Sequence, residues 1–244
     1  MDDDSLWIGL KDTARKALLQ RNYAPAPPAV RVANEGLDAG EVLASEDVFK
    51  ESGVWIPGVE LIHRTIYPQR HRGFFSELGR EAEGHLGKLG LWPKQWAAAR
   101  MFAGSAKGFH IHPPHIPEGE TPESWFTKLF LGEEPDYASR RYDLEQWDVM
   151  YFLQGRLDLI LCDERASLPR RRMRLFIDGD DHRGRNNVAV VIPPGVAHAL
   201  RAEGSEDLFM VYGTSTTFDP ASEGRLASGV EELSLPQEWA GYLD

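Results

Sequence analysis

The sequence predicts an all-β fold, a closed antiparallel barrel or jelly roll. From Val54 onward the chain is a series of short runs rich in β-branched and aromatic residues, such as 148–154 and 188–192. Glycine, proline or polar residues separate these runs, for example Gly155 and the segment Pro193-Pro-Gly195. Many short strands divided by such turns are typical of barrels and jelly rolls.

The expected elements can be placed in order along this part of the chain. A helix-like segment near 78–90 follows the first strand patterns. Thr121-Pro122-Glu123 combines a capping hydroxyl with a proline at the first helical position, and it predicts a short helix at 122–131 over the barrel mouth. The predicted strands lie within 54–67, 72–77, 96–102, 107–112, 148–154, 156–163, 173–177, 188–192, 198–202 and 207–212.

Residues 1–53 are expected to form a helical extension and a linker ahead of the barrel. Apolar residues recur every four positions within 5–21 (Leu6, Leu10, Ala14 and Leu18), which suits a helix that begins at Ser5. Ala24-Pro-Ala-Pro-Pro then ends it, because proline has no amide hydrogen to donate. We therefore predict an extension at 1–53, a barrel at 54–228 with an insertion at 113–147, and a tail at 229–244.

Composition excludes several classes of protein. The 244 residues carry 27 Lys and Arg against 38 Asp and Glu, a formal charge of -11, which argues against binding to nucleic acid or to anionic membranes. The single cysteine, Cys162, excludes an internal disulfide framework and a Cys-rich zinc site. No apolar run reaches membrane-spanning length, and the start Met-Asp-Asp-Asp is unlike a secretory leader. We expect a soluble protein of the cytoplasm.

The strongest functional pattern is the histidine pair His110 and His112. If 107–112 is a strand, the two imidazoles lie on the same face, because side chains alternate along a strand. Such a pair can bind a divalent metal, and it can also place a proton-transferring base beside an orienting neighbour. At this point the residues leave both uses open.

Two spaced motifs resemble those of the cupin superfamily. Gly104 followed after five residues by His110-x-His112 resembles the first cupin motif, and Pro194-Gly195-x-x-His198 resembles the second. From about Trp55 to Leu226 the chain is more narrowly similar to the dTDP-4-dehydrorhamnose 3,5-epimerase family. The ordered motifs that carry this likeness are Arg72-Gly-Phe-Phe-x-Glu77, Lys107-Gly-Phe-His110, Ile192-Pro-Pro-Gly-Val-Ala-His198, and Phe218-Asp-Pro followed by Glu223-Gly-Arg225.

The resemblance implies a cupin jelly-roll barrel and a role for each matching residue. His110 would remove the proton next to a keto group of a sugar, and Tyr212 would act as the acid. Arg72, Glu77 and Lys107 would bind the nucleotide part of the substrate, and His198 would lie in the same pocket. Proton removal next to a carbonyl requires a positioned base near neutral pH and an acid on the other face of the carbon. The resemblance also implies a homodimer.

Several positions depart from that family. Lys107 replaces the usual arginine and loses its bidentate fork, and His112 replaces a glutamine. The lysine expected to stabilise the enolate is replaced by Asp148. The carboxylate partner of the catalytic histidine cannot be located, because the tail beyond Ser228 no longer matches.

Asp148 favours a bound metal. An unscreened carboxylate ~4 Å from an enolate oxygen, at an effective dielectric of ~20, would cost roughly 4 kcal/mol, about a thousandfold in rate. Asp148 also precedes Gly155 at the place of the acidic ligand in metal-binding cupins. His110, His112, Asp148 and His198 therefore form the predicted set for a divalent metal such as Mn, Fe, Ni, Co or Zn.

Three functions from different classes stay open. The first is a sugar epimerase or isomerase acting on a keto-sugar, with a nucleotide-sugar as the expected partner. The second is a metal-dependent cupin oxygenase acting on a small organic substrate, and the third is a cupin that binds a sugar or metabolite without reaction. Asp180, Asp181 and His182 resemble a second metal cluster, but their glycine-rich surroundings favour a polar loop.

Overall fold

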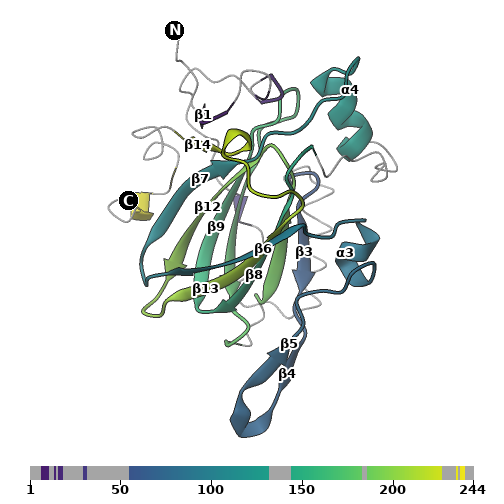
Figure 1. The fold of residues 1–244 in the computed structure, drawn as a ribbon. Helices are drawn as coiled ribbons and strands as arrows, with labels where there is room; N and C mark the ends of the chain where they lie inside the picture. Colours follow the sequence, from purple (N-terminus) through teal and green to yellow (C-terminus); the bar gives the residue numbers. More distant parts are fainter. Residues whose placement is uncertain are drawn as a thin grey trace.

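The computed structural model describes residues 7–10, 14, 16–18, 30–31, 55–131, 144–182, 186–226, 235 and 237–239. Within these ranges the chain forms two large sheets that face each other, and a separate hairpin projects from one end (Figure 1). The all-β jelly-roll fold is confirmed. None of the helices in the described ranges has the length and apolar character that crossing a membrane requires.

The five-stranded sheet has the order β3-β11-β8-β13-β6 and is antiparallel throughout. Its strands are β3 (Glu60–His63), β6 (Gln95–Met101), β8 (Asp148–Gln154), β11 (Val188–Ile192) and β13 (Leu208–Thr214). Strands far apart in the sequence are therefore neighbours, as a jelly roll requires.

The seven-stranded sheet has the order β1-β14-β7-β12-β9-β10-β2. Its strands are β1 (Trp7–Ile8), β2 (Val30–Arg31), β7 (Ala106–Ile111), β9 (Arg156–Asp163), β10 (Arg172–Asp178), β12 (Val196–Glu203) and β14 (Gly224–Leu226). Only the pairing of β2 with β10 is parallel among the pairs described.

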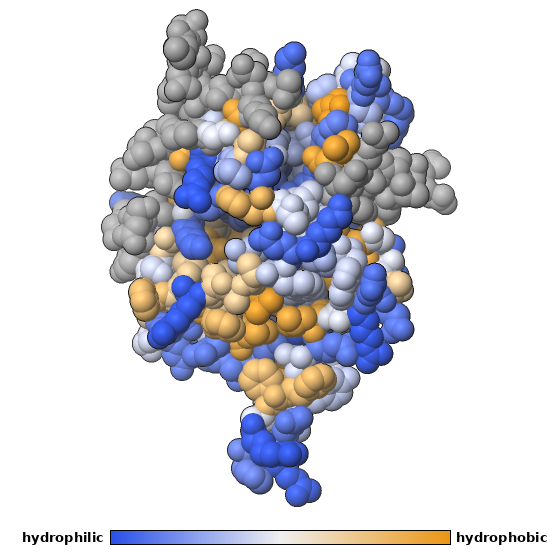
Figure 2. Space-filling model, in the orientation of Figure 1, coloured by the Kyte–Doolittle hydropathy of each residue, from blue (hydrophilic) through white to orange (hydrophobic). Residues whose placement is uncertain are grey.

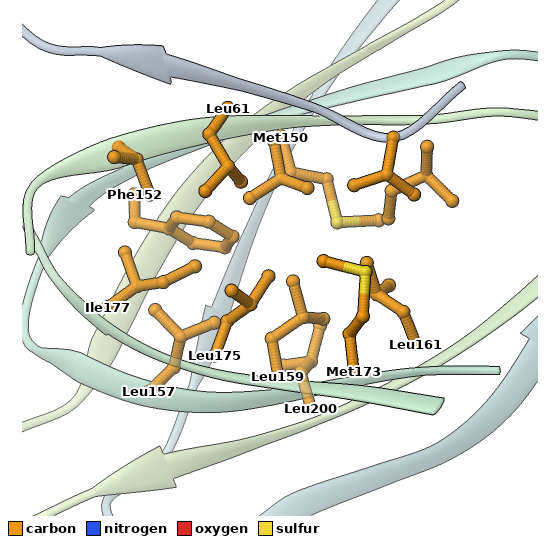
Figure 3. Packing of buried hydrophobic residues seen from close by; sticks show 14 of the residues in the cluster. Leu61, Met150, Phe152, Leu157, Leu159, Leu161, Met173, Leu175, Ile177 and Leu200 are labelled. Atoms are coloured by element: carbon orange, nitrogen blue, oxygen red, sulfur yellow. The ribbon is translucent and has the colours of Figure 1, made fainter. Parts of the chain in front are cut away.

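The main core lies between the two sheets (Figure 3). Alternation along β8 turns Asp148, Met150 and Phe152 toward the barrel interior, whereas Val149 and Tyr151 belong to a second cluster on the outer face. That outer cluster also contains Leu86 of α3 (Gly84–Lys88), so α3 covers part of the sheet. Met150 and Leu200, labelled in Figure 3, belong to the core and also line a cavity beside it.

The turn between β8 and β9 depends on Gly155. Its φ is +83°, a left-handed conformation that side chains disfavour. A Cβ atom there would lie 2.7 Å from the carbonyl oxygen of Asp207, so glycine is also required by the close approach of the neighbouring turn.

The predicted helix over the barrel mouth is present at 122–131. It begins as α4 (Pro122–Phe126), where the amide of Ser124 donates to Thr121 Oγ1 at 3.2 Å, and continues as the π-helical turn η2 (Thr127–Leu131). The predicted helix at 78–90 is shorter, since only α3 is helical.

The predicted N-terminal helix at 5–21 is wrong at Trp7 and Ile8, whereas Ala14, a described residue near its centre, is helical. Trp7 and Ile8 form β1 and pair with β14, and Leu18 bridges Arg165. The rest of that prediction, apart from isolated positions, lies outside the described residues. At Trp7 and Ile8, pairing to the edge of the large sheet replaced the helix that the apolar spacing predicted, because tertiary context outweighs a weak local preference.

The hairpin of β4 (Ile66–Pro68) and β5 (Phe74–Ser76) points away from the barrel (Figure 1). Its tip is the turn η1 (Arg70–Arg72), which is hydrophilic in Figure 2. Tyr67 and Phe75 face each other along it, with ring centroids 6.1 Å apart, and are 55% and 50% exposed.

Candidate active site

A cavity of about 270 Å³ lies inside the barrel next to the core. It contains six of the eight residues predicted for the site, which are Lys107, His110, His112, Asp148, His198 and Tyr212. These side chains come from both sheets, so the fold brings together residues up to about a hundred positions apart. The other two predicted residues, Arg72 and Glu77, lie elsewhere.

Strand β7 supplies two of these side chains, Lys107 and His110, and its register is irregular. Its partner β12 shifts register between His198 and Leu200, which is the mark of a β-bulge. Residues an odd number of positions apart normally face opposite sides of a strand. The irregularity is consistent with both Lys107 and His110 lining the same cavity.

His110 is held by a carboxylate that the sequence did not reveal. Its Nδ1 lies 2.9 Å from Glu223 Oε1, and β14 places this glutamate by pairing Arg225 with His110. Burial lowers the pKa of His110 below its usual value, and Glu223 partly offsets that effect. The lowered pKa favours the neutral imidazole at physiological pH, and Nε2 is the ring nitrogen that Glu223 does not occupy.

His112, Asp148 and His198 form a second, tighter group. Asp148 Oδ2 lies 3.3 Å from His112 Nε2 and 3.8 Å from His198 Nε2, and all three side chains are at least nine-tenths buried. The three ligand atoms lie within 4.8 Å of one another. His110 is not part of this close group, so the predicted four-residue set is divided into a three-residue group and a separate His110–Glu223 pair.

The protonation states of His112, Asp148 and His198 follow from their burial and from their contacts with neighbouring side chains. Burial lowers the pKa of His198 to about 4, so its imidazole is neutral. Burial opposes ionisation of Asp148, but His112, His198 and Gln146 outweigh it and hold the pKa of Asp148 below its usual value. Burial also opposes the charged form of His112, yet Asp148 raises the pKa of His112 overall.

Tyr212 lies on β13, in the sheet opposite the one that carries His110. Burial, together with the charges of Asp148 and Glu223, raises the pKa of Tyr212. The phenol therefore keeps its proton near neutral pH and can serve as an acid. Lys107 and Arg225 add two cationic side chains to the cavity lining.

Arg72 and Glu77 are outside the cavity. Arg72 is exposed at the tip of the hairpin, and Glu77, near its base, forms an exposed ion pair with Arg80 at 3.0 Å. Asp180, which the sequence grouped with Asp181 and His182, is fully buried and binds Arg64, Ser76 and Asn187. Asp180 thus holds the root of the hairpin to the barrel.

Known proteins share this architecture. The dTDP sugar isomerase of Desulfovibrio desulfuricans G20 is 15% identical and superposes with a TM-score of 0.54, over 75% of this chain and 92% of that one. The dTDP-4-dehydrorhamnose 3,5-epimerase of Sulfolobus tokodaii is 20% identical, with a TM-score of 0.51 over 77% and 84% of the two chains. The chain has the fold of the dTDP-sugar epimerases.

Two further comparisons bear on this epimerase fold. ChmJ, a 3'-monoepimerase from Streptomyces bikiniensis in complex with dTDP-quinovose, is 19% identical with a TM-score of 0.52, over 77% of each chain. In sequence, the chain is 27% identical over 150 residues to the spore coat polysaccharide biosynthesis protein SpsL of Bacillus subtilis (strain 168), which is 61% of this chain and 74% of SpsL. No protein-family model matches the sequence.

Within this fold, sequence reasoning missed Glu223 and Gln146. Glu223 was visible as part of the motif Glu223-Gly-Arg225, but only the pairing of β14 with β7 shows that it reaches His110. Gln146 lies two residues before Asp148 and contacts both Asp148 and His112. In the sequence, the feature that could have drawn attention to Gln146 is that it lies two residues before Asp148, a predicted metal ligand.

Proposed function

We propose that this protein is a sugar epimerase or isomerase that transfers protons next to the carbonyl of a nucleotide-linked keto-sugar. The observation that carries the proposal is the His110–Glu223 pair, which faces a cavity whose opposite sheet bears Tyr212. A base on one wall and an acid on the other are what inversion at a carbon requires.

The proposed reaction uses His110 and Tyr212 in turn. Glu223 accepts a hydrogen bond from Nδ1–H of His110, which leaves the lone pair on Nε2. Nε2 takes the proton from the carbon beside the carbonyl, and the C–H electrons pass into an enolate. The Tyr212 hydroxyl then gives a proton to the same carbon from the other face, and exchange with solvent restores both residues.

The cations of the cavity support a phosphorylated substrate. Lys107 and Arg225 line it and can bind the diphosphate of a nucleotide-sugar. The names of proteins with the same fold point to dTDP-sugars, and SpsL is named for polysaccharide biosynthesis. We place the reaction in the cytoplasm, in keeping with the single cysteine.

The test of this function is proton exchange in deuterated water. A dTDP-linked 4-keto-6-deoxyhexose is incubated with the full chain, and NMR follows loss of the hydrogens beside the carbonyl. We expect deuterium at the carbon that becomes inverted. Binding of the sugar with no exchange would instead favour a cupin that recognises a metabolite without reaction.

We further propose that His112, Asp148 and His198 hold a divalent metal. Two ligands that each lie ~2.1 Å from one ion are separated by roughly 3–3.5 Å, and the observed separations of 3.3 and 3.8 Å are close to that. Two imidazoles and a carboxylate suit first-row metals such as Mn, Fe, Co, Ni or Zn. When bound, such an ion supplies Lewis acidity that polarises a carbonyl.

The metal proposal predicts about one equivalent of such a metal in protein purified without chelator. Replacing His198 with alanine removes a neutral, buried ligand and is expected to reduce the metal content to less than about a tenth of an equivalent. Elemental analysis measures this, with His115→Ala as the matched control, because His115 does not line the cavity. A wild-type content that low would contradict the proposal.

Glu223 is expected to set the basicity of His110. Its charge favours the imidazolium, so Glu223→Gln should lower the pKa of His110 further. NMR titration of the His110 ring in chelator-treated protein measures the change. An unchanged or raised pKa would show that Glu223 does not interact with His110 in solution.

We propose a homodimer built on the hairpin and the outer face of the five-stranded sheet. Figure 2 shows apolar side chains gathered on the face that carries β6 and β13, and Trp96 and Phe209 there are 38% and 37% exposed. Sedimentation of the wild type should give twice the mass of the chain, and Tyr67→Ser with Phe75→Ser should shift it toward the monomer. A monomeric wild type would contradict the dimer.

A metal-dependent oxygenase is the second candidate. The observation in its favour is that two histidines and one carboxylate form the close group, the ligand set of many non-haem Fe(II) oxygenases. Oxygen consumption by the Fe(II)-loaded protein with a small organic substrate, in the absence of deuterium exchange into keto-sugars, would favour it.

A further inference from the structure

The carboxylate of Glu223 is contacted from two sides. Its Oε1 lies 2.9 Å from Nδ1 of His110, and Nε and Nη2 of Arg225 both donate to the same oxygen at 3.2 Å. The Glu223 side chain is 13% exposed, whereas that of Arg225 is 67% exposed. One buried carboxylate oxygen therefore joins the proposed base to an arginine that reaches solvent.

The local backbone directs both side chains of this pair into the cavity. Glu223 is extended and immediately precedes β14, so its side chain and that of Arg225, two positions on, face the same side. Gly224, between them, faces the other way. A Cβ atom there would lie 2.8 Å from side-chain atoms of Ile111 and Leu10. This alternation explains why Glu223 and Arg225 both line the cavity.

The contact with Arg225 favours one orientation of the Glu223 side chain. A glutamate loses rotamer freedom when it is held in one place, and that loss opposes its contact with His110. Hydrogen bonds between charged groups are stronger than those between neutral groups, and a guanidinium presents its N–H groups as a rigid fork. Because the arginine is exposed, the pair is expected to affect the placement of Glu223 more than the stability of the fold.

We propose that Arg225 is a positioning residue that holds the Glu223 carboxylate against His110. This inference rests on the proposed epimerase function, in which His110 removes the proton. A guanidinium has further N–H donors, so the same side chain can contact the diphosphate of the substrate while it holds Glu223. Arg225 therefore contributes to the rate of proton removal as well as to substrate binding.

Replacing Arg225 with methionine removes the fork and keeps an unbranched side chain. In the deuterium-exchange assay we expect kcat to fall by ~10–100-fold, because a small misplacement of a catalytic group can cost that much. Arg225→Lys keeps the charge without the fork and should recover part of the loss. Arg156→Met is the matched control, since Arg156 is 59% exposed, pairs with Asp178 and does not line the cavity. Its kcat should equal that of the wild type.

A double-mutant cycle shows whether Arg225 acts through Glu223. In a Glu223→Gln background, Arg225→Met should lower kcat by less than about twofold, because the carboxylate that Arg225 holds is already gone. An arginine that acted only on the diphosphate would instead lose the same factor in both backgrounds. Circular dichroism establishes that each variant is folded before it is compared.

A crystal structure of the full-length Arg225→Met variant gives a readout that does not depend on turnover. We expect the Glu223 carboxylate to move away from Nδ1 of His110. An oxygen of Glu223 that stays within hydrogen-bond distance of Nδ1 would overturn the inference, and so would equal losses of kcat in the two backgrounds. A wild type that exchanges no deuterium would contradict the proposed function instead, and the position of Glu223 in the variant would still decide the role of Arg225.

Discussion

Replacing His110 with asparagine is expected to lower the rate of deuterium incorporation into the keto-sugar by ~10²–10⁴-fold, the usual contribution of a general base. Asparagine keeps a polar group near Glu223 but cannot accept a proton from carbon. The loss should fall mainly on kcat, because the base acts on the reacting atom rather than on substrate binding.

His115→Asn is the control for this substitution. His115 is in the insertion that follows the histidine strand, outside the cavity lining, and its backbone amide donates to Glu145. Its variant should exchange deuterium at the wild-type rate. If His110→Asn keeps more than about a tenth of the activity, His110 is not the base, and His112 or His198 becomes the next residue to replace.

Replacing Arg165 with methionine is expected to lower the free energy of unfolding by ~3–5 kcal/mol, the cost of leaving a buried charge without its partner. Both side chains of the Arg165–Asp163 pair are fully buried, and Arg165 donates to Asp163 from Nε and Nη2 at 2.8 Å each. Arg165 also donates to the carbonyl oxygen of Pro57 and lies 4.3 Å from the ring centroid of Phe130. It therefore joins three segments around the barrel mouth.

Urea unfolding followed by tryptophan fluorescence measures this loss. The matched control is Arg156→Met, because the Arg156–Asp178 pair has an arginine side chain that is 59% exposed. Exposed pairs contribute about 0–1 kcal/mol, so this variant should unfold close to the wild type. Equal losses in the two variants would show that burial of the Arg165 pair does not set its contribution.

The barrel was predictable because its strands have clear local patterns. The runs at 148–154 and 188–192 correspond to β8 and β11. The start of the predicted N-terminal helix was wrong because four-residue spacing of apolar residues does not reveal an available sheet edge. Trp7 and Ile8 extend the sheet at that edge by pairing with β14.

The site was predictable only where its residues lie on patterned strands or in spaced motifs. His110, His112 and His198 belong to such motifs, and they meet in one cavity. The division of the set into His110–Glu223 and His112–Asp148–His198 could not be predicted. It depends on ring orientations and on the long-range pairing of β14, which sequence spacing does not determine.

Described residues on both flanks of the barrel pack on the same outer surface of the large sheet, and this limits how the protein can be shortened. Trp7, Leu10 and Leu18 share one apolar cluster with Leu235 and Trp239, and Trp239 Nε1 donates to the fully buried Asp158 at 3.1 Å. A recombinant fragment cut to the barrel alone, at 54–228, would expose this cluster to water and remove a hydrogen bond from a buried carboxylate. Expression trials and crystallisation are therefore expected to succeed with both flanks retained and to give aggregated material without them.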